Sequence, residues 1–104
     1  MTTSSQQEIY RAKVNLETAQ IAWKELQRFF ASGAAIHVSG DLDLVEVAFQ
    51  MSRDNAAQVR QWMVAGKLGK VTDEQAAAWL KTDALVWAVV VSPWVLVQPS
   101  GSLQ

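Results

Sequence analysis

The sequence contains no cysteine and only one histidine, His37. Disulfide bonds and thiolate metal sites are therefore excluded, and the composition fits a reducing compartment. The chain also lacks an uninterrupted apolar run of about 20 residues, because Ser92-Pro93 divides the longest one. Its first residues do not resemble a signal peptide, since they have neither a basic start nor an apolar centre. We therefore expect a cytoplasmic protein without a membrane partner.

Charge is scarce as well. Nine basic and ten acidic residues among 104 leave a formal net charge of −1, which provides no general attraction to nucleic acid. Residues 54–81 have the outline of a helix–turn–helix, but the second helix would begin at Thr72-Asp73-Glu74, whose carboxylates repel phosphates. No glycine-rich phosphate loop or nucleophile elbow is present. We expect no nucleic-acid partner, no metal and no cofactor.

Hydrophobic residues make up half of the chain, enough for one packed domain. The two ends are polar and rich in Ser, Gly and Pro, which is typical of loose tails. The sequence therefore predicts a disordered tail over residues 1–6, a single domain over 7–98 and a second disordered tail over 99–104.

The most continuous apolar stretch covers residues 84–91 and resumes after Ser92-Pro93 at 94–97. Its β-branched and aromatic side chains favour a strand, and neither face of that strand is polar. Both faces must therefore be covered, as in a central strand. At Pro93 the chain either turns with a cis peptide bond into a hairpin or bends and continues. We expect the two strands to pair.

The rest of the chain shows mainly helical spacing. Apolar residues alternate three and four apart over 5–31 and predict a helix, with a break near Thr18 and a second helix from Ala19. Further helices are expected over 43–53, 55–65 and 72–81, and strands over 34–38 and, as a loop or edge strand, 67–71. The predicted fold class is α+β, with a small, mostly antiparallel sheet of three to four strands packed against four or five helices.

One compact polar cluster contains the single histidine. Four residues form it: His37, Asp41, Asp43 and Glu46. Imidazole and carboxylates together could act as a general base or hold a divalent metal ion. A structural explanation also exists, because Asp43 and Glu46 occupy the N-cap and third positions of the predicted helix. Under that explanation His37 is a partly buried strand residue with one hydrogen bond.

Five tryptophans are many for so small a domain: Trp23, Trp62, Trp79, Trp87 and Trp94. Each can bury on the order of 150–250 Å², and its indole N–H needs an acceptor, so the margins of cores and interfaces suit it. They indicate a Trp-rich core, a protein interface or a ligand pocket. Our interface candidates are Trp94 beside Pro93, followed by Trp87 and Trp23.

Several segments resemble a known family. They are Glu17-Thr-Ala, Ile21-x-Trp23-x-Glu25-Leu26-x-x-Phe29-Phe30, Leu42-Asp-Leu-Val-Glu-Val-Ala48, Val59-x-x-Trp62-x-x-x-Gly66, Asp73-Glu-Gln-Ala76-x-x-Trp79 and the run from Trp87 to Gln98. Together they are similar to a small bacterial family, domain of unknown function 2288, over about residues 16–98. The resemblance implies a bacterial, cytosolic, stand-alone protein. It implies no activity and no functional residues.

Two functions remain open at this point. The first is a non-enzymatic module that acts through protein contacts or self-association, since a homodimer would cover a strand that is apolar on both faces. The alternative is a ligand-binding or enzymatic domain that uses the His37 cluster beside a Trp-lined pocket. We favour the module, and we leave open whether an enzymatic activity exists.

Overall fold

The computed structural model describes residues 18–100 of the chain. In chain order its elements are β1 (Ala19–Ala22), the 3-10 helix η1 (Trp23–Leu26), α2 (Gln27–Ala31), β2 (Ala35–Val38), α3 (Leu44–Ser52), α4 (Ala56–Val64), β3 (Leu68–Lys70), α5 (Asp73–Lys81), β4 (Leu85–Val91) and β5 (Trp94–Pro99). Within residues 18–100, no helix is long and apolar enough to cross a membrane.

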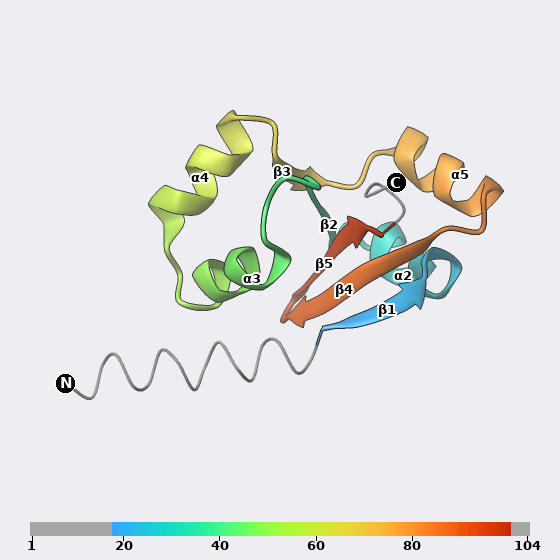
Figure 1. Ribbon diagram of the computed structural model, residues 1–104, viewed down its shortest axis with the longest axis horizontal. Helices are drawn as coiled ribbons and strands as arrows, with labels where there is room; N and C mark the ends of the chain where they lie inside the picture. The colour runs from blue at the N-terminus through green and yellow to red at the C-terminus, as the bar shows by residue number, and fades with distance from the viewer. Residues whose placement is uncertain (1–17, 101–104) are drawn as a thin grey trace.

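The strands form one five-stranded sheet in the order β1-β4-β5-β2-β3 (Figure 1). The β2–β5 pair is parallel, whereas β1–β4, β4–β5 and β2–β3 are antiparallel. The fold is therefore α+β with a mixed sheet, as expected in class. The expected count of three to four strands was wrong, because β1 had not been foreseen.

The hairpin at Pro93 is confirmed. The Ser92–Pro93 peptide bond is cis, and β4 and β5 pair in register from Val91 opposite Trp94 to Val86 opposite Pro99. Beyond the hairpin, Ser100 donates from Oγ to the carbonyl oxygen of Leu85 at 2.9 Å. This hydrogen bond holds Ser100 against the start of β4. The tail predicted over residues 1–6 and the part of the predicted 99–104 tail from residue 101 onwards lie outside the described residues.

The helix predicted from Ala19 was wrong over its first turn. Ala19–Ala22 is a strand, and helical structure begins only at Trp23. Helix propensities differ by tenths of a kcal/mol per residue, so a neighbouring strand can override them. Here β1 satisfies the otherwise open edge of β4, with Ile21 opposite Val86. The predicted helix before Thr18 lies outside the described residues.

The predicted helix ends are largely confirmed. The Thr72 hydroxyl accepts from the Gln75 N–H while the Gln75 side chain accepts from the Thr72 N–H, a complete capping box for α5. Two glycines end helices in the left-handed region that only glycine enters without strain, Gly33 at φ 80° and Gly66 at φ 76°.

Two hydrophobic cores lie on opposite faces of the sheet. We call them the Trp23 core and the α3 core. The Trp23 core packs η1, α2 and α5 on one face, and its buried residues are Trp23, Leu26, Ala35, Val71, Ala76, Val86, Val95 and Val97. The α3 core packs α3 and α4 on the other face, and its buried residues are Ile36, Val38, Leu44, Val47, Ala48, Leu68, Val89 and Leu96. The helices of the two cores lie towards opposite ends of the molecule (Figure 1).

This diagonal arrangement covers each face of β4 over half of its length. Val86 in the first half is buried in the Trp23 core, and Val89 in the second half is buried in the α3 core. The remaining side chains of each face are exposed: Leu85 (49%) and Trp87 (37%) on the α3 side, and Val90 (61%) on the Trp23 side. The strand is central, as expected, but its two faces are not covered completely.

Candidate functional site

His37 lies on the face of the sheet that carries the Trp23 core. Its neighbours Ile36 and Val38 are buried in the α3 core, so strand alternation turns the imidazole to the other side. There its ring centroid lies 5.9 Å from that of Trp79 on α5. Burial against these apolar groups lowers the pKa of His37 from its ordinary value of 6.5. The histidine is therefore neutral at physiological pH and half-buried beside an indole.

The three carboxylates of the cluster have structural partners. Asp41 accepts from the Ser39 hydroxyl and pairs with Lys67 Nζ at 2.7 Å, and these partners lower the pKa of Asp41 to about 2, with Lys67 the larger cause. Asp43 caps α3 by accepting from the Val45 N–H at 3.0 Å. Glu46 accepts from the Gln50 side-chain amide at 2.7 Å. The contacts of Asp41 and Asp43 are common in loops and at helix N-termini, and that of Glu46 is a common side-chain pair within a helix.

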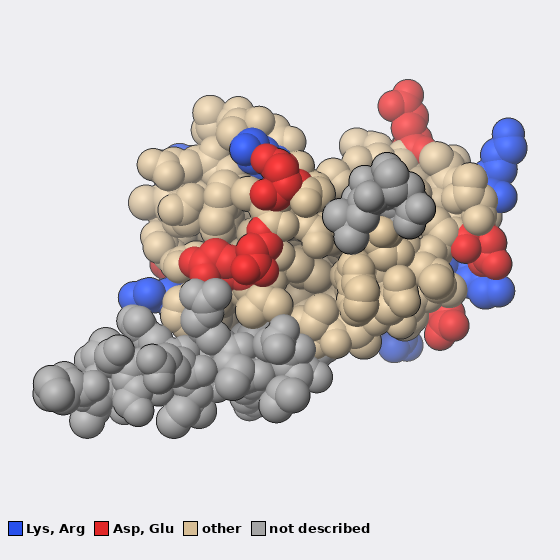
Figure 2. Space-filling view, viewed as in Figure 1, with Lys and Arg blue, Asp and Glu red and all other residues tan. Residues whose placement is uncertain are grey.

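The sheet separates His37 from two of the carboxylates that were expected to work with it, Asp43 and Glu46. Asp43 and Glu46 belong to α3, which covers one face, while the imidazole is on the other. Figure 2 shows acidic side chains gathered near the start of α3. Within residues 18–100, no group of three or more His, Asp or Glu is arranged to hold a metal ion. The cluster is compact in the sequence because the strand and the helix are consecutive, whereas in the structure His37 and the two carboxylates at α3 lie on opposite faces of the sheet.

The tryptophans divide between core and surface. Trp23 is 0% exposed, donates from its indole nitrogen to the Ala76 carbonyl oxygen at 3.2 Å, and meets Trp79 edge-on with ring centroids 5.0 Å apart. Its expected place at an interface was wrong, because the Trp23 side chain is the centre of a core. Trp62, Trp79 and Trp94 are partly buried against the cores.

Trp87 is the tryptophan that the structure leaves most exposed. It shares the uncovered corner of the sheet with Leu85, and the edge strand β1 runs beside both through the pairs Gln20–Trp87 and Ala22–Leu85. Figure 2 shows only uncharged residues over the middle of β4. We call Leu85 and Trp87 the exposed corner. Of the three tryptophans among the interface candidates, Trp87 therefore has the side chain that a partner could reach most directly.

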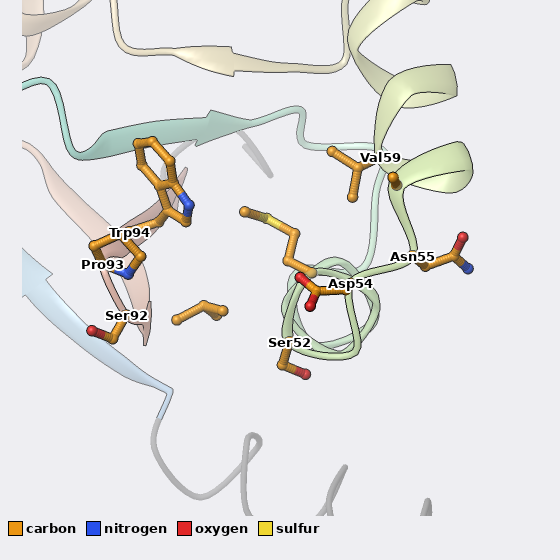
Figure 3. Close-up of a pocket in the computed structure, with 10 residues that line it drawn as sticks. Ser52, Asp54, Asn55, Val59, Ser92, Pro93 and Trp94 are labelled. Atoms are coloured by element: carbon orange, nitrogen blue, oxygen red, sulfur yellow. The ribbon is translucent and has the colours of Figure 1, made fainter.

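Pro93 and Trp94 lie on one side of a cleft of about 620 Å³. The opposite side is the turn between α3 and α4, where Asp54 and Val59 point towards the hairpin and Asn55 points away from it (Figure 3). Six of the ten lining residues are apolar: Met51, Ala56, Val59, Val91, Pro93 and Trp94. The cleft extends the α3 core, since Met51, Val59, Val91 and Trp94 pack against that core. It contains none of the four residues of the His37 cluster.

Sequence reasoning found one wall of this cleft and missed the other. Pro93 and Trp94 stood out as a proline turn followed by an aromatic residue, whereas Asp54 and Asn55 were recognised only as the break between two helices. Asp54 takes a positive φ of 57° there, which Asp tolerates better than most residues. About forty residues separate the two walls, so no local pattern could have paired them.

Comparisons with known proteins place the chain in a family. The model of the family DUF2288, described as proteins of unknown function, matches residues 9–99. The NMR solution structure of PA1075 from Pseudomonas aeruginosa is 47% identical in sequence, with a TM-score of 0.78, and the alignment covers 86% of this chain and 82% of that one. No curated protein is similar enough to count as a match. The family match covers most of the chain, and the chain therefore belongs to the DUF2288 family.

Proposed function

We propose that the protein is a non-enzymatic module of the bacterial cytoplasm that acts by self-association, with the exposed corner as its contact surface. One observation carries the proposal: Leu85 and Trp87 are exposed on a sheet face whose other half is closed by α3 and α4. Apolar side chains on a sheet face normally pack against a second layer. The described residues supply no such layer over this corner, and a second copy could do so.

The edge strand β1, which lies beside the exposed corner, also supports a second copy of the chain as the partner. β1 ends the sheet on this side and carries no charged residue between Ala19 and Ala22. At the opposite edge, β3 includes Lys70 and is preceded by Lys67, and lysines on an edge discourage pairing with another chain. A second copy that pairs along β1 would bring the exposed corners of both chains close to one two-fold axis.

The size of the corner limits the strength of this contact. Its two side chains expose on the order of 200 Å², whereas a standard interface buries about 800 Å² per partner. Backbone pairing along β1 and the flanking Gln20 and Ala22 must therefore contribute. We expect a dimer whose population depends on protein concentration.

Static light scattering over a roughly hundredfold range of concentration tests the proposal. We expect the mass to rise towards that of a dimer for the unaltered protein and to stay monomeric for Trp87→Lys, which places an unpaired charge in the contact. Val90→Lys is the matched control, because Val90 is exposed on the same strand but on the other face. A monomeric mass over the whole range, or equal behaviour of the two variants, would contradict self-association through this corner.

The enzymatic alternative is not proposed. It required His37 to meet at least one carboxylate of its cluster at the mouth of a cleft. The imidazole instead packs beside Trp79, on the face of the sheet opposite α3.

A further inference from the structure

The cleft beside the β4–β5 hairpin combines an aromatic wall with a carboxylate. Trp94 lines it from the hairpin, Met51 and Val59 line it from the two helices, and Asp54 points across it towards the hairpin (Figure 3). Its volume of about 620 Å³ is typical of small-molecule sites. A ligand in this cleft would therefore meet an indole, aliphatic groups and a negative charge in one space.

The charge of the cleft is negative. None of the described residues that line it is basic, and Asp54 is the one acidic residue among them. The helix termini at the cleft do not alter this balance, because the C-terminus of α3 and the N-terminus of α4 carry partial charges of opposite sign. The Asn55 side chain is engaged as the cap of α4, where it accepts from the Gln58 N–H at 3.3 Å. The carboxylate of Asp54 is therefore the group that a charged ligand would meet.

A second aspartate shows what Asp54 lacks. Asp54 and Asp83 both follow a helix at positive φ, 57° and 52°, and each backbone N–H donates to the carbonyl oxygen three residues earlier. Glycine occupies the corresponding place after α2 and α4, so this kind of turn does not require a carboxylate. Asp83 forms an ion pair with Lys24 at 3.9 Å, whereas no basic side chain among residues 18–100 forms an ion pair with Asp54. Of these two aspartates, one has a cation and the other faces the cleft without one.

An organic ammonium ion matches these walls. The carboxylate attracts its charge, and an indole ring attracts a cation through its π-face. The thioether of Met51 and the side chain of Val59 provide surface for an alkyl body. An anion would be repelled by Asp54, and an uncharged apolar molecule would remove water from the carboxylate without replacing it.

We propose that the cleft binds a small primary amine with an apolar body. The ammonium group faces Asp54 and Trp94, and the apolar body lies against Met51 and Val59. The site does not depend on self-association through the exposed corner, because neither residue of that corner lines the cleft.

Hexylammonium and hexanol are matched probes, because they share an alkyl chain and differ in charge. Each is titrated into the full-length protein while NMR spectra follow the Trp94 indole and Met51 methyl signals. We expect hexylammonium to shift both signals with a dissociation constant on the order of 1 mM. Hexanol should bind roughly tenfold more weakly, because it makes no charge-assisted contact.

The two aspartates provide matched variants. Asp54→Asn removes the carboxylate and introduces a residue that tolerates positive φ, so the turn is retained. It should weaken hexylammonium binding roughly tenfold and leave hexanol binding unchanged. Asp83→Asn makes the same change of charge in the same backbone conformation outside the cleft, and both affinities should stay as they are.

Four results would overturn the proposal. Equal affinities for hexylammonium and hexanol would show that the cleft accepts apolar groups without regard to charge. Equal weakening in Asp54→Asn and Asp83→Asn would show a general attraction between the protein and cations. Unchanged Trp94 and Met51 signals would show that no amine binds in the cleft. Shifts that grow with protein concentration in the absence of amine, and that Asp54→Asn abolishes, would assign the cleft to a basic side chain of a second copy.

Discussion

The two halves of β4 are both entirely apolar, but they are covered on opposite faces. Val86 in the first half is buried under η1, α2 and α5, while Val89 in the second half is buried under α3 and α4 on the other face. A strand that is apolar on both sides therefore need not be buried on both sides. Each helix layer covers one face over half of the strand, and the corners left over, at Trp87 and Val90, are the exposed apolar positions.

The two cores also differ in how completely they are closed. The Trp23 core has a fully buried indole at its centre, held by a hydrogen bond and by edge-on contacts with Phe30 and Trp79. The buried residues of the α3 core are all aliphatic, and this core opens into the cleft at Met51 and Trp94. We infer that the Trp23 core contributes more to stability and that the α3 side offers more for binding.

The largest effect is expected in the Trp23 core. Trp23→Ala should lower the free energy of unfolding by about 3–5 kcal/mol, because it leaves a large cavity and removes the donor to the Ala76 carbonyl. Denaturant unfolding followed by circular dichroism would measure the loss. A cost below about 1.5 kcal/mol would mean that the core collapses around the missing indole, and the contrast between the two cores would not hold.

A smaller effect is expected at the cleft. Met51→Ala should cost about 1–2 kcal/mol, because Met51 is half-buried and its side chain already borders open space. The same unfolding measurement applies, so the two variants can be compared directly. A loss equal to that of Trp23→Ala would show that the α3 core is as completely closed as the Trp23 core.

Substitutions at the helix caps test whether the α3 side and the Trp23 side of the sheet lose similar amounts of stability when one cap is removed. Asp43→Ala on the α3 side and Thr72→Ala on the Trp23 side should each cost about 1 kcal/mol, since each removes a side-chain acceptor at a helix N-terminus. Thermal unfolding of both variants would measure it. A markedly larger loss for Asp43→Ala would indicate that the carboxylate does more than cap α3.

The smallest effect concerns the pH dependence of stability. Burial lowers the pKa of His37, so the unfolded chain binds a proton more readily than the folded one below about pH 6.5. Its contribution to stability is complete above that pH and is lost as the pH falls through the lowered pKa. We expect the unfolding temperature to fall less between pH 7.5 and 5.5 for His37→Gln than for the unaltered protein. Identical pH profiles would contradict this assignment.

Local patterns predicted most elements of the fold. Apolar periodicity located α3, α4 and α5, and the Thr72–Gln75 pattern marked the start of α5. Continuous β-branched residues located β4 and β5, and the Ser92-Pro93 step marked their hairpin. These features depend on residues close in sequence, which is why sequence reasoning could find them. β1 was missed because Ala19–Ala22 becomes a strand only by pairing with a segment more than sixty residues away.

The candidate sites also show that closeness in the sequence and closeness in the structure are different things. His37, Asp43 and Glu46 are near one another in the sequence, and the sheet keeps the histidine apart from these two carboxylates. The two walls of the cleft are far apart in the sequence, and the fold brings them together.

The sequence by itself determined the class of the fold, the positions of the helices and of the central hairpin, and the absence of thiol chemistry, because each follows from residue types or short periodicities. Only the tertiary structure decided that β1 completes the sheet, that Trp23 is core while Trp87 is surface, and that a cleft faces the hairpin. The physical reason is that burial depends on which elements pack over a residue. In this chain, two helix layers lie on opposite faces of one sheet and are offset along it. Each layer therefore buries only the residues beneath it.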